Sequence, residues 1–491
     1  MWKEIAMVDK KVLLINPKFT EEVSIFNIPI SLLYLGSWLT SKGYPVQILD
    51  ALHFKSEDSL RSRIVTELSK SSYIGFTVMS TQIPHALELS RLVKKYSSSI
   101  PIIWGGAHPT LYPEQTLASE YIDYVVVGDG EEALEGLCKN QITNGGIIYG
   151  GTLDIDKIPG VDWNLLGELE TGVSLSEMSN LTEFGLPILA SKGCPHKCAF
   201  CINSVLGVKY RQRNIRLVLR DIKDALWKGI TRLEFVDECL LASKKRVNQL
   251  VDEISKEGLK FDWAAGSRTD YFRNSYLDIP FLKKLRNAGC WFIGTGAESG
   301  SQRILDRVNK GTKVEDTLNM ARKMKEVGIR GNFSFMIGLP GEELEDYKAT
   351  LSLISKLVRV NPDVYILGPQ TYRPYPGSKL YEECKAYGMR VPQNLEEWAQ
   401  SPYIHFEFSS KKHYLKEYYP WVQFKGDLPT LIFYTTLMGL RPRFKPVTKV
   451  LRLIGRIRCK LFFFKFPILK IIYGLLRNSW IEKFLRQRRI I

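Results

Sequence analysis

The sequence predicts an α/β fold with three parts: a flavodoxin-like or Rossmann-like first domain, a partial (βα)6 TIM-like barrel, and a helical C-terminal region. Two separate runs of short apolar segments alternate with longer helical ones, and a glycine-rich stretch divides the two runs. Strands that alternate with helices form parallel sheets. The length of 491 residues also suggests about three domains. The predicted boundaries are 1–140 and 184–385 for the two α/β domains, 141–183 for a linker, and 386–491 for the C-terminal region.

The first domain is predicted from five apolar segments of strand length. These segments are Val12–Asn16, Val46–Asp50, Ile74–Val78, Ile102–Gly105 and Tyr124–Val127. Helical periodicity separates them, for example at Ile30–Ser41 and Ala86–Lys95. An open parallel sheet of this kind binds its ligand beyond the carboxyl ends of the strands.

The barrel is predicted from a second alternation that follows the turn signals of residues 141–183, such as Asn144-Gly145-Gly146. Its expected strands are Pro187–Ser191, Arg232–Val236, Phe261–Gly266, Trp291–Thr295, Asn332–Ile337 and Val364–Gly368. The helices between them include Ile215–Trp227, Lys244–Lys256, Thr312–Val327 and Leu344–Val358. Six βα units make three-quarters of an eight-fold barrel, whose active site is expected at the carboxyl ends of the strands.

Three of the eight cysteines, Cys194, Cys198 and Cys201, are clustered directly after the first barrel strand. Soft thiolate ligands suit iron, and three of them leave one iron of a four-iron cluster open. A zinc site is disfavoured because no second cysteine pair follows and His196 is badly placed to complete one. Three ordinary structural cysteines are the alternative. The other five cysteines are scattered, which argues against a disulfide framework and for a reducing, intracellular compartment.

This cysteine motif, at this place in a barrel, resembles the radical S-adenosylmethionine (radical SAM) superfamily. The resemblance implies a 4Fe-4S cluster on the three cysteines, with S-adenosylmethionine bound at the open iron. Phe200, just before the third cysteine, matches the aromatic residue that packs near the adenosyl group, although a plain core aromatic would look the same.

Residues at the later strand ends agree with this resemblance. It places Asp237 and Glu238 near the methionyl amino group and Arg268 on the carboxylate, which arginine binds as a fork. It places Glu298 near the ribose and Gly338 near adenine. Each of these side chains taken alone could instead be an ordinary surface or salt-bridge residue. Glu342 departs from the family pattern, because it follows Gly338 by four residues rather than three, and its role stays open.

The strand ends of the first domain resemble the cobalamin domain found in one group of radical SAM enzymes. Paired glycines there let the backbone approach a flat ligand. The resemblance implies cobalamin contacts from Ser80, Thr81, Gly105, Gly106, His108 and Gly128. The sequence lacks the Asp-x-His-x-x-Gly pattern of a histidine that ligates cobalt, since His53 has the wrong spacing. His108 is interpreted as a structural or capping histidine, and a domain that lost its cofactor is the alternative.

The basic charge is confined to the C-terminal tail. Residues 441–491 contain 15 lysines and arginines against one acid, whereas the other 440 residues are nearly balanced. Apolar residues recur between the basic ones as in an amphipathic helix at a membrane surface. An ordinary helical cap on the barrel and a nucleic-acid contact are the alternatives, and the Phe462–Phe464 cluster disfavours the latter. No run of 18 apolar residues predicts a spanning helix.

The resemblance therefore implies a cobalamin-dependent enzyme that uses a 5′-deoxyadenosyl radical and methylcobalamin to methylate an unactivated carbon. The tail makes a lipid or other membrane-associated substrate the first hypothesis, with flavodoxin or ferredoxin as electron donor. Cyclisation or oxidation without methyl transfer, modification of a nucleic acid, and a non-enzymatic cobalamin carrier are the alternatives. The sequence assigns no catalytic residue. The N-terminus lacks the pattern of a secretory signal, so we expect a cytoplasmic protein with peripheral contact at the inner face of the membrane.

Overall fold

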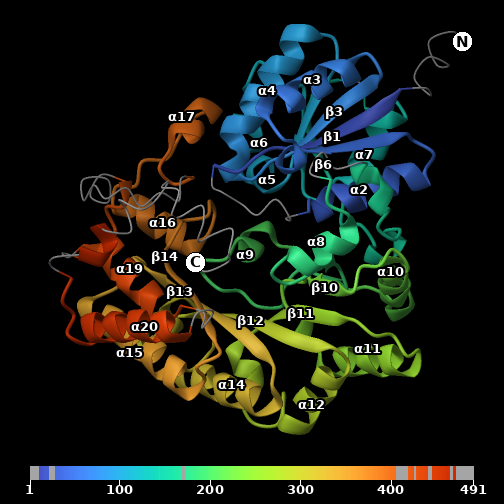
Figure 1. The fold of residues 1–491 in the computed structure, drawn as a ribbon. Helices are drawn as coiled ribbons and strands as arrows, with labels where there is room; N and C mark the ends of the chain where they lie inside the picture. The colour runs from blue at the N-terminus through green and yellow to red at the C-terminus, as the bar shows by residue number, and fades with distance from the viewer. Residues whose placement is uncertain are drawn as a thin grey trace, which may run out of the picture. The chain divides into compact units, whose positions relative to one another are not determined.

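The structure is a computed structural model that describes residues 10–20, 28–142, 144–167, 172–404, 418–424, 427–440, 445–464 and 468–471 (Figure 1). The first sheet has six strands in the order β2-β1-β3-β4-β5-β6, and its neighbours pair in parallel. The strands are β1 (Lys11–Asn16), β2 (Val46–Asp50), β3 (Ser71–Thr77), β4 (Ile102–Gly105), β5 (Tyr124–Val127) and β6 (Gly146–Tyr149). The order of the first five is that of a flavodoxin-like sheet, so the predicted fold class is confirmed.

Helices cover both faces of this sheet, as a parallel sheet requires. They are α2 (Ile30–Ser41), α3 (Glu57–Leu68), α4 (Ile83–Tyr96), α5 (Ala107–Leu111), α6 (Pro113–Leu117) and α7 (Glu131–Cys138). Helix α2 packs with α7, and α3 packs with α4. The core between the layers includes Leu13, Ile15 and Trp104, whose side chains are fully buried.

The strand β6 lies within residues 141–183, which the sequence predicts to be a linker. Its first residue, Gly146, belongs to the glycine pair that signals a turn. A Cβ on Gly145 would lie 3.0 Å from the Asp123 carbonyl oxygen, so the glycine is needed for a close approach of two backbones. Four residues at a sheet edge are also too short to show a periodic pattern.

A second set of six parallel strands forms a sheet in the order β14-β13-β12-β11-β10-β7. The strands are β7 (Leu186–Ile188), β10 (Arg232–Phe235), β11 (Asp262–Ser267), β12 (Cys290–Glu298), β13 (Arg330–Ile337) and β14 (Tyr365–Thr371). All six lie where the barrel strands were predicted. The expected strand Pro187–Ser191 is divided, because its last residue starts the short strand β8 (Ser191–Lys192), which pairs with β9 (Arg211–Gln212) as an antiparallel ladder.

Helices connect the strands of this second region. They are α8 (Leu175–Leu181), α9 (Ile202–Leu206), α10 (Ile215–Trp227), α11 (Lys244–Lys256), α12 (Ile279–Asn287), α13 (Gln302–Arg307), α14 (Val314–Val327), α15 (Leu344–Val360) and α16 (Lys379–Ala386). The bounds of α10 and α11 are those expected from the sequence. Both have a side-chain cap at the start, from Asn214 and Ser243, and one buried apolar face.

The chain divides into two compact units, which are described separately. Unit 1 comprises Met1–Gly193, Leu206–Val236 and Arg390–Glu407, and unit 2 comprises the remainder. The C-terminal region therefore contributes to both. In unit 1, α17 (Leu395–Gln400) packs on the first domain, where Trp398 Nε1 donates to Gln115 Oε1 at 2.7 Å.

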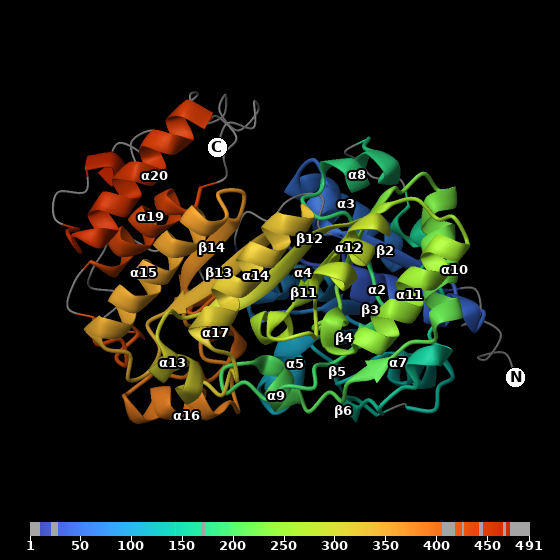
Figure 2. The same cartoon turned by 90° about the horizontal axis from the view of Figure 1, so that it is seen from below.

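In unit 2, α19 (Leu428–Met438) and α20 (Lys445–Lys460) lie side by side (Figure 2). A Cβ on Gly455 of α20 would lie 2.7 Å from the Tyr434 carbonyl oxygen of α19. This glycine lets the two helix backbones approach closely.

Candidate functional site

The three clustered cysteines lie in a loop that begins and ends at the β8–β9 ladder. Ser191 pairs with Gln212 and Lys192 with Arg211, so the two ends of the loop meet. Gly193 has a φ of +84°, and a Cβ there would lie 2.5 Å from the Lys209 carbonyl oxygen. Only glycine suits this turn, which immediately precedes the first cysteine.

Within unit 2, hydrogen bonds hold the cysteine loop against the segment after α13. The Ala199 N–H donates to the Val308 carbonyl oxygen at 2.9 Å, and Asn309 Nδ2 donates to the Lys197 carbonyl oxygen at 2.8 Å. Cys198 is buried, and Cys194 and Cys201 are half-buried. The thiols are thus presented by an anchored loop.

The donor set fits an iron–sulfur cluster. In the described part of the chain, no three His, Cys, Asp or Glu side chains are arranged to hold a single metal ion. A cluster distributes its ligands over several irons, so its three thiolates need not converge on one point. The residues that would hold it here are Cys194, Cys198 and Cys201.

Two buried cations lie beside these thiols. Arg268 Nη1 lies 3.5 Å from Cys198 Sγ, and Arg268 Nε donates to Asp270 Oδ1 at 3.0 Å. Lys310 Nζ lies 2.7 Å from Glu298 Oε1 and 5.6 Å from the centre of the Phe200 ring. Positive charge next to cysteines favours their thiolate form. No motif in the sequence marks Lys310, and its importance emerges only from this packing.

The structure brings together several residues predicted to surround S-adenosylmethionine. Phe200 and Glu298 both contact Lys310, and Arg268 donates to the Lys310 carbonyl oxygen. Glu298 has a φ of +59°, a conformation that costs energy in a residue with a side chain. Asp237 and Glu238 follow β10, the former buried and the latter exposed. Arg268 and Glu298 already have partners of opposite charge, so their predicted ligand contacts stay predictions.

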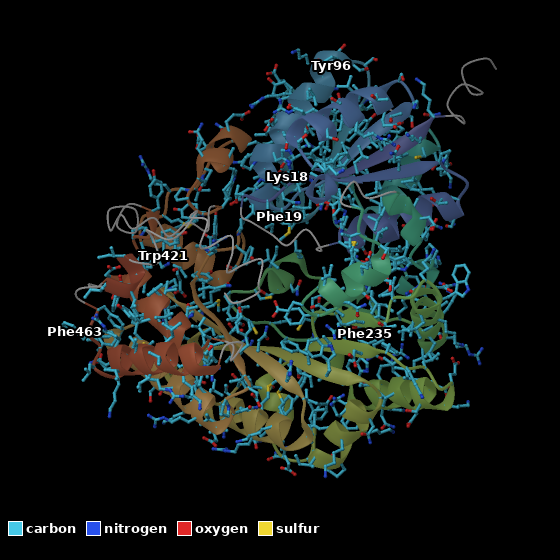
Figure 3. All side chains as sticks on the ribbon, viewed as in Figure 1. Lys18, Phe19, Tyr96, Phe235, Trp421 and Phe463 are labelled. Atoms are coloured by element: carbon cyan, nitrogen blue, oxygen red, sulfur yellow. The ribbon has the colours of Figure 1, made fainter. Side chains whose placement is uncertain are left out.

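The structure indicates a role for Glu342, which the distance of four residues from Gly338 in the sequence left open. Its carboxylate accepts hydrogen bonds from the N–H groups of Gly338 and Leu339, at 2.5 and 3.1 Å. Gly338 has a φ of +74°, and its carbonyl oxygen accepts from Trp421 Nε1 at 3.0 Å (Figure 3). Glu342 is buried and holds the turn after β13, so we interpret it as a residue that shapes the predicted adenine region.

The burial of the Glu342 carboxyl group predicts how the stability of the protein depends on pH. Burial raises the pKa of Glu342 from 4.5 to about 8, against the hydrogen bonds from Leu339 and Gly338. Because the folded state holds this proton more tightly than the unfolded state, stability should fall as the pH rises from 4.5 towards 8 and level off above that. Glu342→Gln keeps an oxygen acceptor that does not titrate. The stability of this variant should therefore not show the part of the decline between pH 4.5 and 8 that Glu342 causes.

Urea unfolding across this pH range measures the effect. Glu345→Gln, in the exposed first turn of α15, is the matched control and should keep the wild-type slope. An unchanged slope in Glu342→Gln would contradict the prediction.

The candidate cobalamin residues lie at the carboxyl ends of β3, β4 and β5 in unit 1. They are Ser80, Thr81, Gly105, Gly106, His108 and Gly128. Gly106 has a φ of +101°, and a Cβ there would lie 2.9 Å from the Val78 nitrogen. The Gly128 N–H donates to Thr110 Oγ1 at 3.2 Å. Glycine backbone at this edge fits the approach of a flat ligand.

His108 itself is fully buried. Its Nδ1 lies 3.1 Å from Ser80 Oγ, and its ring packs against Tyr112 and Trp398 at centroid distances of 5.3 and 5.2 Å. Burial lowers the pKa of His108 to about 3, so the ring stays neutral. This environment supports the interpretation of His108 as a structural residue.

Asp129, next to Gly128, joins the two parts of unit 1. It forms ion pairs with Lys192 and Arg211, the two residues that face each other in the β8–β9 ladder. This carboxylate is not among the candidate residues predicted from the sequence. The sequence feature that could have marked Asp129 as a candidate is its position after the fifth strand, within Gly128-Asp129-Gly130.

Comparisons with known proteins agree with both halves of this description. A family model for the radical SAM superfamily matches residues 188–354, and one for the B12 binding domain matches residues 21–138. An uncharacterized methyltransferase of Pyrococcus horikoshii is 28% identical over 396 residues, which cover 75% of this chain and 81% of the relative. An anaerobic magnesium-protoporphyrin IX monomethyl ester cyclase of Rubrivivax gelatinosus is 27% identical and covers 76% and 70%.

Among solved structures, the radical S-adenosylmethionine methyltransferase TsrM of Kitasatospora setae, with cobalamin and a [4Fe-4S] cluster bound, has a TM-score of 0.59 at 20% identity. The match covers 78% of this chain and 76% of that one, and it establishes a common fold. Both domains and their order thus agree: the chain contains a radical SAM domain and a B12 binding domain, and it is a cobalamin-dependent radical SAM enzyme whose cofactors are a 4Fe-4S cluster, S-adenosylmethionine and cobalamin.

Proposed function

We propose that this enzyme methylates an unactivated carbon of a lipid or another membrane-associated substrate. When bound, the cluster and S-adenosylmethionine supply a 5′-deoxyadenosyl radical, and cobalamin supplies the methyl group. The electron would come from a flavodoxin or ferredoxin. Methyl transfer is supported by the similarity to the Pyrococcus horikoshii methyltransferase.

The chain's own residues would bind and orient these groups. We assign Cys194, Cys198 and Cys201 to the cluster, and Asp237, Glu238, Arg268, Glu298 and Gly338 to S-adenosylmethionine. Arg268 and Lys310 add positive charge where the cluster and the methionyl carboxylate would add negative charge. Trp421 and Glu342 hold the Gly338 turn. These contacts support a pre-arranged pocket for the nucleoside.

The observation that carries the membrane part of the proposal is an exposed apolar stripe on α20. Val450, Leu453 and Ile457 are 57%, 55% and 50% exposed, and Leu461, just after the helix, is 67% exposed. Their spacing places the first three on one face of the helix. Phe463 is exposed beyond it (Figure 3). Such a face favours contact with hydrocarbon over continued exposure to water.

The opposite side of α20 explains why the stripe is exposed. Gly455 faces α19, and Arg452 is buried, where Nε donates to the Leu440 carbonyl oxygen at 2.8 Å and Nη1 donates to the Pro362 carbonyl oxygen at 3.0 Å. Helix α20 therefore packs on unit 2 as a cap would, but with the apolar stripe on its outer side. Lys449 and Lys460 are exposed beside it. Cations flanking an apolar stripe fit an anionic lipid surface better than the phosphates of a nucleic acid.

No helix in the described part of the chain is long and apolar enough to cross a bilayer.

We expect Leu453→Gln/Ile457→Gln to bind anionic phosphatidylglycerol vesicles about a hundredfold more weakly than wild type, because each of the two buried aliphatic side chains contributes roughly 1.5 kcal/mol. Lys449→Gln/Lys460→Gln should weaken binding as well, by roughly 1 kcal/mol per charge, and this part should vanish at high salt. Vesicle co-sedimentation measures both.

Trp227→Gln is the matched control, because Trp227 is an exposed apolar residue of α10 in unit 1. It should bind vesicles as wild type does. If the stripe variant also binds like wild type, the lipid-surface proposal fails. Point variants are used because deletion of α20 would expose the face of α19 that it covers.

The second candidate is cyclisation or oxidation of a substrate without net methyl transfer. The similarity to the Rubrivivax gelatinosus cyclase favours it, because this relative is 27% identical over 76% of the chain. S-adenosylmethionine with a labelled methyl group separates the two functions. Label transferred to products of a membrane extract supports methylation, whereas a product that forms without label supports the second candidate.

A further inference from the structure

After the barrel strands, the chain returns to the first domain. Residues 390–404 belong to unit 1 together with the first sheet, and their helix α17 packs on α4. Arg91 Nη2 of α4 donates to Glu396 Oε1 at 2.9 Å, and Gln115 Nε2 of α6 donates to the Pro392 carbonyl oxygen at 2.9 Å. The segment is therefore anchored to the same compact unit that carries the candidate cobalamin residues.

This segment reaches two of the candidate cobalamin residues, one directly and one through a single intervening residue. The ring of Trp398 packs edge-on against the ring of His108, with centroids 5.2 Å apart. Six residues later, the Ile404 carbonyl oxygen accepts a hydrogen bond from Thr20 Oγ1 at 2.6 Å, and the Thr20 N–H donates to the Thr81 carbonyl oxygen at 2.9 Å. The segment thus supports the loop after β3 and the loop after β4.

The His108 ring depends on packing for its orientation. Its Nδ1 lies 3.1 Å from Ser80 Oγ, whereas Nε2 is buried and makes no hydrogen bond to the part of the chain that the structure describes. One hydrogen bond leaves a ring free to tilt, so the rings of Tyr112 and Trp398 that pack against it limit its position. Trp398 is itself fixed, because its Nε1 donates to Gln115 Oε1 at 2.7 Å.

The position of His108 in turn sets the backbone that cobalamin would approach. The His108 N–H donates to the Val78 carbonyl oxygen at 3.1 Å, and the Val78 N–H donates to the Gly105 carbonyl oxygen at 2.8 Å. A Cβ on Gly106 would lie 2.9 Å from the Val78 nitrogen, so the two loops are in close contact. A shift of His108 would therefore move Ser80 and the glycine pair with it.

We propose that residues 390–404 complete the cobalamin-binding domain, with Trp398 as a positioning residue that holds His108 and so fixes the loops after β3 and β4. Trp398 is 6% exposed, so it acts through His108 rather than by touching cobalamin. Loops that are already fixed need not be ordered when a ligand binds, and this tightens binding. The inference rests on the assignment of cobalamin to these loops and not on the methylation of a lipid.

The first test measures the dissociation constant of hydroxocobalamin on the full chain, from the change in its visible absorption. Trp398→Leu removes the ring that packs on His108, and we expect about tenfold weaker binding, as for other residues that orient a binding group. Trp398→Phe keeps an aromatic ring and loses only the N–H that donates to Gln115. Its affinity should lie between those of Trp398→Leu and wild type.

Trp163→Leu is the matched control. Trp163 is also a buried tryptophan of unit 1, at 4% exposure, but it lies in η4 (Trp163–Leu166), which packs on α2 and β2. This variant should bind hydroxocobalamin as wild type does. Equal losses of affinity in Trp163→Leu and Trp398→Leu would overturn the proposal, because the cause would then be a general loss of folding. Wild-type affinity in Trp398→Leu would also overturn it.

Hydrogen exchange of the wild-type protein gives a second test that needs no variant. Because the segment and the two loops hold each other in place, binding of hydroxocobalamin should slow amide exchange in residues 394–404 as well as in the loops after β3 and β4. Slower exchange in the loops alone would overturn the proposal, and unchanged exchange in the loops would remove the site on which it rests. Neither test uses S-adenosylmethionine or a lipid, so a failure of the proposed methylation would leave both results unchanged.

Discussion

Cys198→Ala is expected to abolish formation of 5′-deoxyadenosine and to remove most of the cluster iron. Cys198 is the buried member of the three, at 7% exposure, and its sulfur lies 3.5 Å from Arg268 Nη1. Its loss would leave two thiolates for a cluster that needs three from the protein. Iron analysis and product quantification under strong reductant, with S-adenosylmethionine and cobalamin present, measure the effect.

Cobalamin retention distinguishes this loss from general misfolding. The first sheet has its own core, so Cys198→Ala should still bind cobalamin. Cys384→Ala, which removes a buried thiol from α16, should keep both iron and product. Wild-type product formation by Cys198→Ala would show that the three cysteines do not hold the cluster.

Lys310→Met is expected to destabilise the folded protein by about 3–5 kcal/mol, since it leaves the Glu298 carboxylate buried without its partner. The two charged atoms lie 2.7 Å apart, and both side chains are less than a tenth exposed. Glu298 also has a positive φ, so the pair holds a strained segment in place. The free energy of unfolding of the cluster-free protein in urea measures this effect.

The double variant Lys310→Met/Glu298→Gln should recover a large part of the loss, because it removes the second charge as well. Lys284→Met is the surface control. It breaks the exposed ion pair with Asp252, whose contribution should be at most about 1 kcal/mol. If Lys310→Met and Lys284→Met lose equal stability, the buried pair does not support the fold as proposed.

The positions of the strands could be predicted closely because buried parallel strands are short apolar runs. β2, β4 and β5 have the bounds expected from the sequence, and β6 was missed because a four-residue edge strand that begins with glycine looks like a turn. The strand-end residues followed from the same reasoning. The carboxyl ends of parallel strands meet at one edge, so Arg268 and Glu298 were expected near each other, and each of them contacts Lys310.

The partners of these residues could not be predicted. Lys310 has no motif, and Glu342 has a spacing that left its role open. Residues 386–430 are rich in aromatic side chains, Trp398 among them, and the sequence does not show whether these side chains pack in the core or contact substrate. In the structure Trp398 packs on His108 of the first domain, some 290 residues earlier in the chain. Tyr414, in the same aromatic-rich segment, lies outside the described residues, as does most of the basic tail beyond residue 464.

The sequence alone determined the class of this enzyme, because cysteine spacing and strand periodicity are local properties that survive as a pattern in one dimension. It also determined that the tail is basic and amphipathic. Only the tertiary structure decided which side of α20 is buried: Gly455 and Arg452 face unit 2, and the aliphatic stripe remains outside. It likewise decided which side chains share the surroundings of the cysteines. Tyr271, which follows β11, contacts His196 of the cysteine loop, and such an encounter depends on the packing of a whole sheet rather than on any local pattern.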